Sequence, residues 1–148
     1  MRKIVLLGLI FWGIPLFAKE YGGMGVRKDT FGNSVHYSVK MDIQDFETSK
    51  VVKTTYAHPD KKPYSIVLKL LVKKGGFLEI LVPYTPTPGE GYYIDNCYHM
   101  KLPGDGKYEE SWNFDQGRIE KWGSTTVNGQ RIIWKESLQA VGEPLSPK

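Results

Sequence analysis

The stretch from Tyr64 to Pro83 carries the clearest hydrophobic pattern after the N-terminus. Every second residue of its first half is apolar, which is the period of a β-strand with one buried face; these residues are Tyr64, Ile66, Leu68, Leu70 and Val72. A second apolar face follows the loop and comprises Leu78, Ile80 and Val82. The pattern predicts a hairpin whose two apolar faces point to the same side.

The register of this hairpin follows from the two faces, because a slip of one residue would turn every side chain of a strand to the opposite side. A three-residue loop, Lys74 to Gly76, places Val72 opposite Leu78, with a glycine in the left-handed conformation that such loops need. A two-residue loop would place Glu79 opposite Val72 instead. We therefore predict the three-residue loop.

Several other segments have the alternation or the composition of strands. The residues from Val35 to Ile43 alternate cleanly, and the Val- and Thr-rich segment 50–57 suits a polar strand. Segments 92–102 and 110–114 alternate as well, whereas the three prolines of 83–91 exclude a continuous strand there. The glycine-rich segment 19–34 is weakly patterned, and we interpret it as a lead-in loop with at most one short strand.

The C-terminal hairpin is the best-specified local feature of the sequence. Asn128-Gly129 is the strongest short signal for a two-residue hairpin turn. The register that follows places Lys121 opposite Glu136 and Trp134 over Gly123, so a charge pair and a ring-on-glycine contact agree with the turn. We predict this register, followed by a flexible tail over 139–148.

These elements predict an all-β fold. We expect an antiparallel up-and-down meander of about eight strands that forms a small barrel or a two-sheet sandwich, because each strand is joined to the next by a short loop. The architecture resembles that of lipocalin-like barrels. A fold by itself does not give a function.

The N-terminus has the pattern of a secretory signal. A basic start, Met1 to Lys3, precedes 14 apolar, glycine or proline residues from Ile4 to Phe17, and Ala18 offers a small residue for cleavage. A permanent membrane anchor would need about 20 apolar residues. We predict a signal peptide over 1–18 and a single β domain over 19–148. The N-terminal segment would then contact the membrane only during export.

Charge and composition restrict the possible partners of the chain and the interactions that can stabilise its fold. Loss of Arg2 and Lys3 with the signal lowers the formal net charge from +4 to +2, and no basic cluster indicates a nucleic-acid partner. Cys97 is the single cysteine, so the fold must rely on packing rather than on a disulfide within the chain. Aromatic residues make up 13% of the chain, which favours β structure and large buried contact areas.

No convincing catalytic or metal site emerges from the sequence. Asp95, Cys97 and His99 share one face of the predicted strand 92–102, but alternate residues stand about 6.5 Å apart, too far for a direct Cys–His hydrogen bond. Cys97, His99 and Met100 are ligand types of a copper site, but Met100 points to the other side of the strand. We predict no catalytic residues, no metal and no cofactor.

The aromatic residues are the best candidates for a binding site. Five of them fall on faces expected to point inward, where they either fill the core or line a space for an apolar ligand: Tyr37, Tyr92, Tyr98, Trp112 and Trp134. We expect Asn96 on the same face as an orienting polar group, and the proline-rich loop that carries Tyr84 at the rim of the mouth. The predicted ligand-binding residues are Tyr37, Tyr84, Tyr92, Asn96, Tyr98, Trp112 and Trp134.

These observations favour a periplasmic or secreted binding module that is not an enzyme and holds a small apolar ligand or an envelope protein. One alternative is a small integral outer-membrane barrel, since one-sided apolar alternation fits that class as well. A secreted hydrolase is a second alternative, resting on the residues around Cys97.

Overall fold

The computed structural model describes residues 17–104 and 107–142 and contains ten β-strands. The strands follow one another along the chain, with a short 3₁₀ turn, η1 (Lys74–Gly76), after the fourth. Their bounds are β1 (Phe17–Lys28), β2 (Ser34–Asp45), β3 (Ser49–Ala57), β4 (Tyr64–Val72), β5 (Phe77–Leu81), β6 (Gly89–Ile94), β7 (Cys97–Leu102), β8 (Tyr108–Asp115), β9 (Arg118–Val127) and β10 (Gln130–Ala140).

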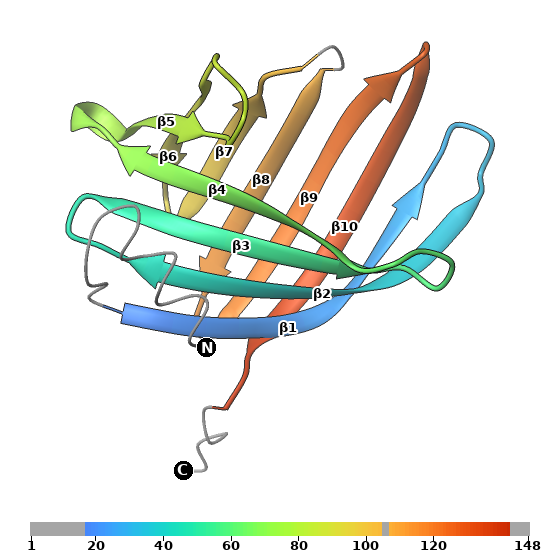
Figure 1. Cartoon of the computed structure of the whole chain (residues 1–148), viewed down its shortest axis with the longest axis horizontal. Helices are drawn as coiled ribbons and strands as arrows, with labels where there is room; N and C mark the ends of the chain where they lie inside the picture. Colours follow the sequence, from blue (N-terminus) through green and yellow to red (C-terminus); the bar gives the residue numbers. More distant parts are fainter. Residues whose placement is uncertain (1–16, 105–106, 143–148) are drawn as a thin grey trace.

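The strands form a closed antiparallel barrel. Each strand pairs with the next in sequence, and β1 pairs with β10 to close the sheet. Figure 1 shows β2, β3 and β4 crossing in front of β8, β9 and β10, so the barrel is flattened into two layers that face each other. The predicted class, an antiparallel all-β meander, is confirmed. Of the two predicted architectures, the structure is the barrel and not the sandwich.

The predicted register of the central hairpin is confirmed. Val72 lies opposite Leu78 and Leu70 opposite Ile80, and the three-residue loop contains Gly75 at a φ of 84°. A positive φ of this size favours glycine because a side chain would meet the backbone. Both apolar faces point into the barrel.

The register of the C-terminal hairpin is confirmed as well. Lys121 lies opposite Glu136 and Trp134 opposite Gly123. Asn128 and Gly129 have φ values of 52° and 76°, as a type I′ turn requires. A Cβ on Gly123 would lie 2.5 Å from the Trp134 ring, so the glycine leaves the space that this ring fills.

The strand count was predicted too low, for two separate reasons. The glycine-rich segment expected as a lead-in loop forms most of β1, which pairs with β2 on one side and β10 on the other. The segment 92–102 is not one strand but two, because Asp95 and Asn96 adopt left-handed φ values of 52° and 62° and turn the chain between β6 and β7. Asparagine and aspartate tolerate this conformation better than most residues.

The predicted terminal segments are placed only in part. Of the expected tail over 139–148, Gln139 and Ala140 belong to β10, and 143–148 lie outside the described residues. The predicted signal peptide over 1–18 lies outside them except for its last two residues, which begin β1. No helix within the described ranges has the length and apolar composition needed to cross a bilayer.

The core lies inside the barrel, where inward side chains from all the long strands meet. Met41, Val52, Leu70, Ile80 and Ile119 are completely buried there. Their burial is the main stabilising contribution that the alternating pattern predicts. The inward faces are not wholly apolar, however, and the polar residues among them define the candidate site.

Candidate functional site

One end of the barrel is open to solvent. Along β4 the inward side chains become steadily more exposed toward the start of the strand: Leu70 is 0% exposed, Leu68 4%, Ile66 38% and Tyr64 43%. Val127, inward on β9 at the same end, is 48% exposed. Apolar side chains that point into a barrel are normally buried by their neighbours. The inward side chains at this end are thus less covered than those in the middle of the barrel, and we call it the open end; at the other end of β4, inward Val72 is 45% exposed beside a smaller hollow of about 260 Å³.

The short strand β5 explains the opening. It pairs with β4 only from Lys69 to Val72, and the prolines that follow Val82 end it. The first half of β4 pairs with β3 alone, and Figure 1 shows that β5 does not extend along this half. The barrel wall is interrupted at this place, beside the exposed Tyr64 and Ile66.

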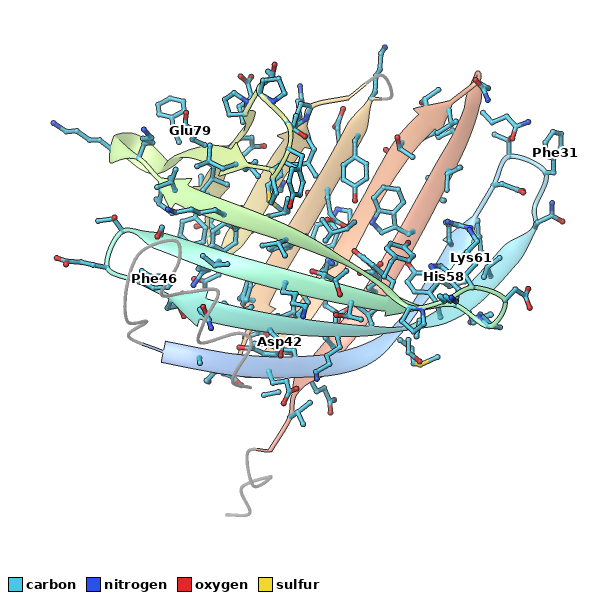
Figure 2. The ribbon with its side chains drawn as sticks, viewed as in Figure 1. Phe31, Asp42, Phe46, His58, Lys61 and Glu79 are labelled. Carbon is cyan, nitrogen blue, oxygen red and sulfur yellow. The ribbon has the colours of Figure 1, made fainter. Side chains whose placement is uncertain are left out.

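Aromatic side chains line the open end on two facing sides. On the β2–β4 side, the Tyr37 ring lies 4.7 Å from that of His58, and the Tyr64 hydroxyl lies 3.4 Å from His58 Nε2. On the opposite side, Tyr108 of β8 and Trp134 of β10 have their ring centres 5.1 Å apart. His58 comes from the loop between β3 and β4, at the end of the molecule that Figure 2 labels with His58 and Lys61.

A charge cluster of Lys121, Glu110 and Glu136 forms the floor of the open end. The three residues are 0%, 4% and 2% exposed. Lys121 Nζ lies 3.0 Å from Glu136 Oε1 and 4.0 Å from Glu110 Oε2. One ammonium group thus stands between two carboxyl groups inside the barrel, where unpaired charges would be very unfavourable.

Aromatic hydrogen-bond donors complete this floor. The Tyr37 hydroxyl donates to Glu136 Oε2 at 2.6 Å, and Trp134 Nε1 donates to Glu110 Oε2 at 2.7 Å. The cluster therefore holds one ring on each side of the open end in position. Hydrogen bonds to charged groups are among the stronger ones in proteins, so these two rings are firmly oriented.

The cluster also shifts the titration of its members. Burial raises the pKa of Glu110, against the opposing effect of the Lys121 charge. Burial by itself would lower the pKa of Lys121, but the two carboxyl groups outweigh it and the pKa is raised. Lys121 is thus cationic at neutral pH. Perturbed buried groups of this kind are typical of functional sites, although structural ion pairs show them too.

A separate hollow lies on the outer face of β1 and of β5 to β10. It has a volume of about 1340 Å³, and its lining includes Tyr92, His99, Trp122 and Ile133. The Tyr92 and His99 rings stack at 4.7 Å, and His99 Nδ1 lies 3.0 Å from the Ser111 hydroxyl. Glu110 and Trp134 also border this hollow, but the Glu110 carboxyl group turns into the barrel, toward Trp134 Nε1 and Lys121. On the outer face, His99 and Ser111 contact each other. We therefore take the open end, and not the outer hollow, as the candidate site.

The structure brings together three of the seven predicted binding residues. Tyr37 and Trp134 lie at the open end, as described above. Trp112 is 1% exposed and packs beneath them, with Lys121 Nζ 5.1 Å from the centre of its ring. Its Nε1 lies close enough to Glu110 to lower the pKa of that residue, although its geometry falls short of a hydrogen bond.

The other four predicted residues lie apart from this group. Tyr98 is buried toward the opposite end of the barrel, against Tyr93, with ring centres 4.5 Å apart, and it lines the smaller hollow there. Tyr92 points outward into the outer hollow, and Tyr84 is fully exposed on the proline-rich loop. Asn96 occupies the turn between β6 and β7, where it accepts a hydrogen bond from the Tyr93 hydroxyl at 3.1 Å. Asn96 is thus not the inward polar group expected from the alternation.

The sequence reasoning missed the charge cluster even though it predicted the pairing of Lys121 with Glu136. The overlooked signal was that Lys121 alternates with Ile119 and Glu136 with Leu138, so the pair lies on an apolar face and not on the surface. The same alternation identifies Glu110 as inward, since it precedes Trp112 by two residues.

The residues considered for catalysis or metal binding are separated in the structure. Asp95 lies in a turn, while Cys97 and His99 point outward on β7. The hydrogen-bond partner of His99 is Ser111 rather than Cys97, and burial raises the pKa of the Cys97 thiol, which disfavours a thiolate. Within the described residues, no group of three or more His, Cys, Asp or Glu side chains is placed to hold a metal ion.

No model of a known protein family matches the chain, and no curated protein sequence matches it. Its structure is similar to that of the S-type phycobiliprotein lyase CPES from Guillardia theta, with a TM-score of 0.70 and 12% identity over 84% of this chain and 88% of that chain. A redesigned β-barrel, b11L5F_LGL, matches with a TM-score of 0.40 and 16% identity over 80% of this chain and 87% of that chain.

The first likeness corrects one prediction. We expected from the sequence that the protein is not an enzyme, and that expectation is wrong, because the fold is shared with a protein that is itself named a lyase. Lack of a recognisable catalytic motif on such a barrel does not exclude catalysis. At 12% identity the likeness establishes the fold: the chain is an antiparallel ten-stranded barrel similar to that of a phycobiliprotein lyase.

Proposed function

We propose that the protein binds a small molecule with a planar, largely apolar body at the open end of its barrel. The observation that carries this proposal is the exposure of Tyr64 and Ile66, which point into the barrel and yet are 43% and 38% exposed. Each remains in contact with water at a place where a ligand would bury it. Burial of apolar surface stabilises a complex by about 25 cal/mol per Å².

The shape of the open end favours a flat ligand. Its two aromatic sides, Tyr37 with His58 and Tyr108 with Trp134, come from opposite layers of the barrel. Hydrogen bonds to the floor hold Tyr37 and Trp134 in place before any ligand arrives, so little side-chain entropy is lost on binding. Small barrels commonly hold one such ligand, and the fold likeness reported above is compatible with this role.

Binding of the neutral fluorophore 1-pyrenemethanol to the purified full chain tests this proposal. We expect saturable binding that a Trp134→Leu variant weakens by about tenfold or more, because large aromatic contacts dominate binding energies. Trp122→Leu is the matched control, since Trp122 is a tryptophan in the outer hollow, and it should change the affinity less than about threefold.

Trp134→Leu loses the hydrogen bond to Glu110 and could misfold, so a second variant tests the site without that change. Ile66→Asp alters an already exposed position, so it should keep the fold and still weaken binding. Loss of binding in Trp122→Leu with retention in Trp134→Leu would move the site to the outer hollow and overturn the proposal. Absence of saturable binding to the unmodified protein would overturn it too.

We also propose that the protein works outside the cytoplasm, in the periplasm or the medium. The basic start followed by a short apolar run supports this, and cleavage after Ala18 would leave Lys19 to Lys28 available for β1. N-terminal sequencing of the protein from the cell envelope should find Lys19 as the first residue. A sequence that starts at Met1 would contradict cleavage.

A further inference from the structure

Arg27 stands out among the charged residues of the barrel. It lies on β1 between Val35 of β2 and Trp134 of β10, and the alternation of β1 turns its side chain into the open end. It is half-buried. In the part of the chain that the structure describes, its guanidinium group makes neither an ion pair nor a hydrogen bond with another residue.

The two carboxyl groups at the floor of the open end, those of Glu136 and Glu110, already have partners other than Arg27. Glu136 is bound by Lys121 and Tyr37, and Glu110 by Trp134 with Lys121 beside it. A guanidinium group offers five N–H donors in a fork that matches two oxygen atoms. Arg27 therefore presents an unused binding group beside apolar rings, where a charge without a counterion is unfavourable.

The charge of Arg27 affects the pKa values of two neighbouring groups, His58 and Tyr64. Burial lowers the pKa of His58, and the charges of Arg27 and Lys61 lower it further, while Glu136 acts in the opposite direction. Arg27 also opposes the raising of the Tyr64 pKa by burial. His58 is consequently neutral at neutral pH, and the charge of Arg27 acts on both His58 and Tyr64.

We propose that Arg27 binds the carboxylate of the ligand, which makes the ligand a planar or extended apolar monocarboxylate. This inference rests on the proposed function, since it assumes that the open end is the binding site. The carboxylate would accept two parallel hydrogen bonds from the guanidinium group while the apolar body lies against Tyr64 and Trp134. One cation without a second permanently charged partner at the same depth suits a monoanion better than a phosphate with two charges.

The test compares 1-pyrenebutyrate with its methyl ester, which has the same apolar body and no charge. A hydrogen-bonded ion pair of this kind corresponds to about tenfold to hundredfold in affinity. We expect the unmodified protein to prefer the acid to the ester by about this factor, and Arg27→Gln to abolish the preference while binding the ester as before. Arg27→Lys should restore it only in part, because lysine keeps the charge and loses the fork.

Arg131→Gln is the matched control, since Arg131 is an exposed arginine on the outer face of β10. It should leave both affinities unchanged. Equal binding of acid and ester by the unmodified protein, or an equal preference in Arg27→Gln, would overturn the role of Arg27 while leaving the proposed function intact. Failure of both probes to bind would instead overturn the proposed function. Arg27→Gln should keep the melting temperature of the unmodified protein, because the side chain has no partner to lose.

Discussion

Replacement of Lys121 by methionine is expected to lower the free energy of unfolding by about 3–5 kcal/mol. Methionine is close to lysine in length and suits a buried position, so packing changes little. What changes is the charge: Glu136 and Glu110 remain buried at 2% and 4% exposure without their ammonium partner. Chemical denaturation of the two proteins measures the difference directly.

A second Lys–Glu pair in the same molecule provides the control. Lys40 Nζ lies 2.7 Å from Glu20 Oε2, closer than the pair in the core, but these side chains are 55% and 36% exposed. Lys40→Met should cost less than about 1 kcal/mol, because water screens the pair and solvates the carboxylate that is left. Similar losses in both variants would show that burial does not decide the effect.

Replacement of Gly25 by alanine is expected to destabilise the barrel by about 2–4 kcal/mol, although it adds a single methyl group. Gly25 lies in register between Tyr37 on β2 and Glu136 on β10. A Cβ at this position would lie 2.7 Å from the Tyr37 ring and 2.6 Å from Glu136 Cγ. The hydrogen bond between those two side chains passes over Gly25 and exists only because the position is empty.

Gly22 of the same strand is the matched control. A Cβ there would meet only Val141 Cγ2, at an ordinary distance of 3.4 Å. Gly22→Ala should be neutral or slightly stabilising, by up to about 1 kcal/mol, since alanine loses less backbone freedom on folding. If Gly25→Ala proves equally harmless, Tyr37 and Glu136 would not be held in the arrangement described here.

Both effects belong to the binding site as well as to stability. Tyr37 and Trp134 owe their orientation to Glu136 and Glu110, so a change in the floor displaces the rings that are proposed to hold the ligand. Variants of the charge cluster should therefore be used to measure stability, and variants such as Ile66→Asp and Arg27→Gln to measure binding, because these last side chains form no part of the floor.

The sequence by itself determined the local pairing. Two hairpins were predicted to the residue, because alternation defines a buried face and Asn128-Gly129 or the Lys74–Gly76 loop allows one register only. The sequence did not reveal β1, because the glycine-rich segment that forms this strand has no periodic hydrophobic pattern. That strand exists because β2 and β10 both pair with it, and its glycines give room to side chains that come from those two strands.

Only the tertiary structure decided which predicted contacts are buried and which are exposed. Lys121 and Glu136 were correctly paired, but closure of the barrel placed the pair in the core and brought Tyr37, 99 residues away from Glu136, into hydrogen-bond distance. Closure likewise turned Arg27 toward the open end, and the short β5 left that end unfilled. Such features depend on which strands become neighbours and where the wall ends, and a pattern that repeats every two residues contains no information about either.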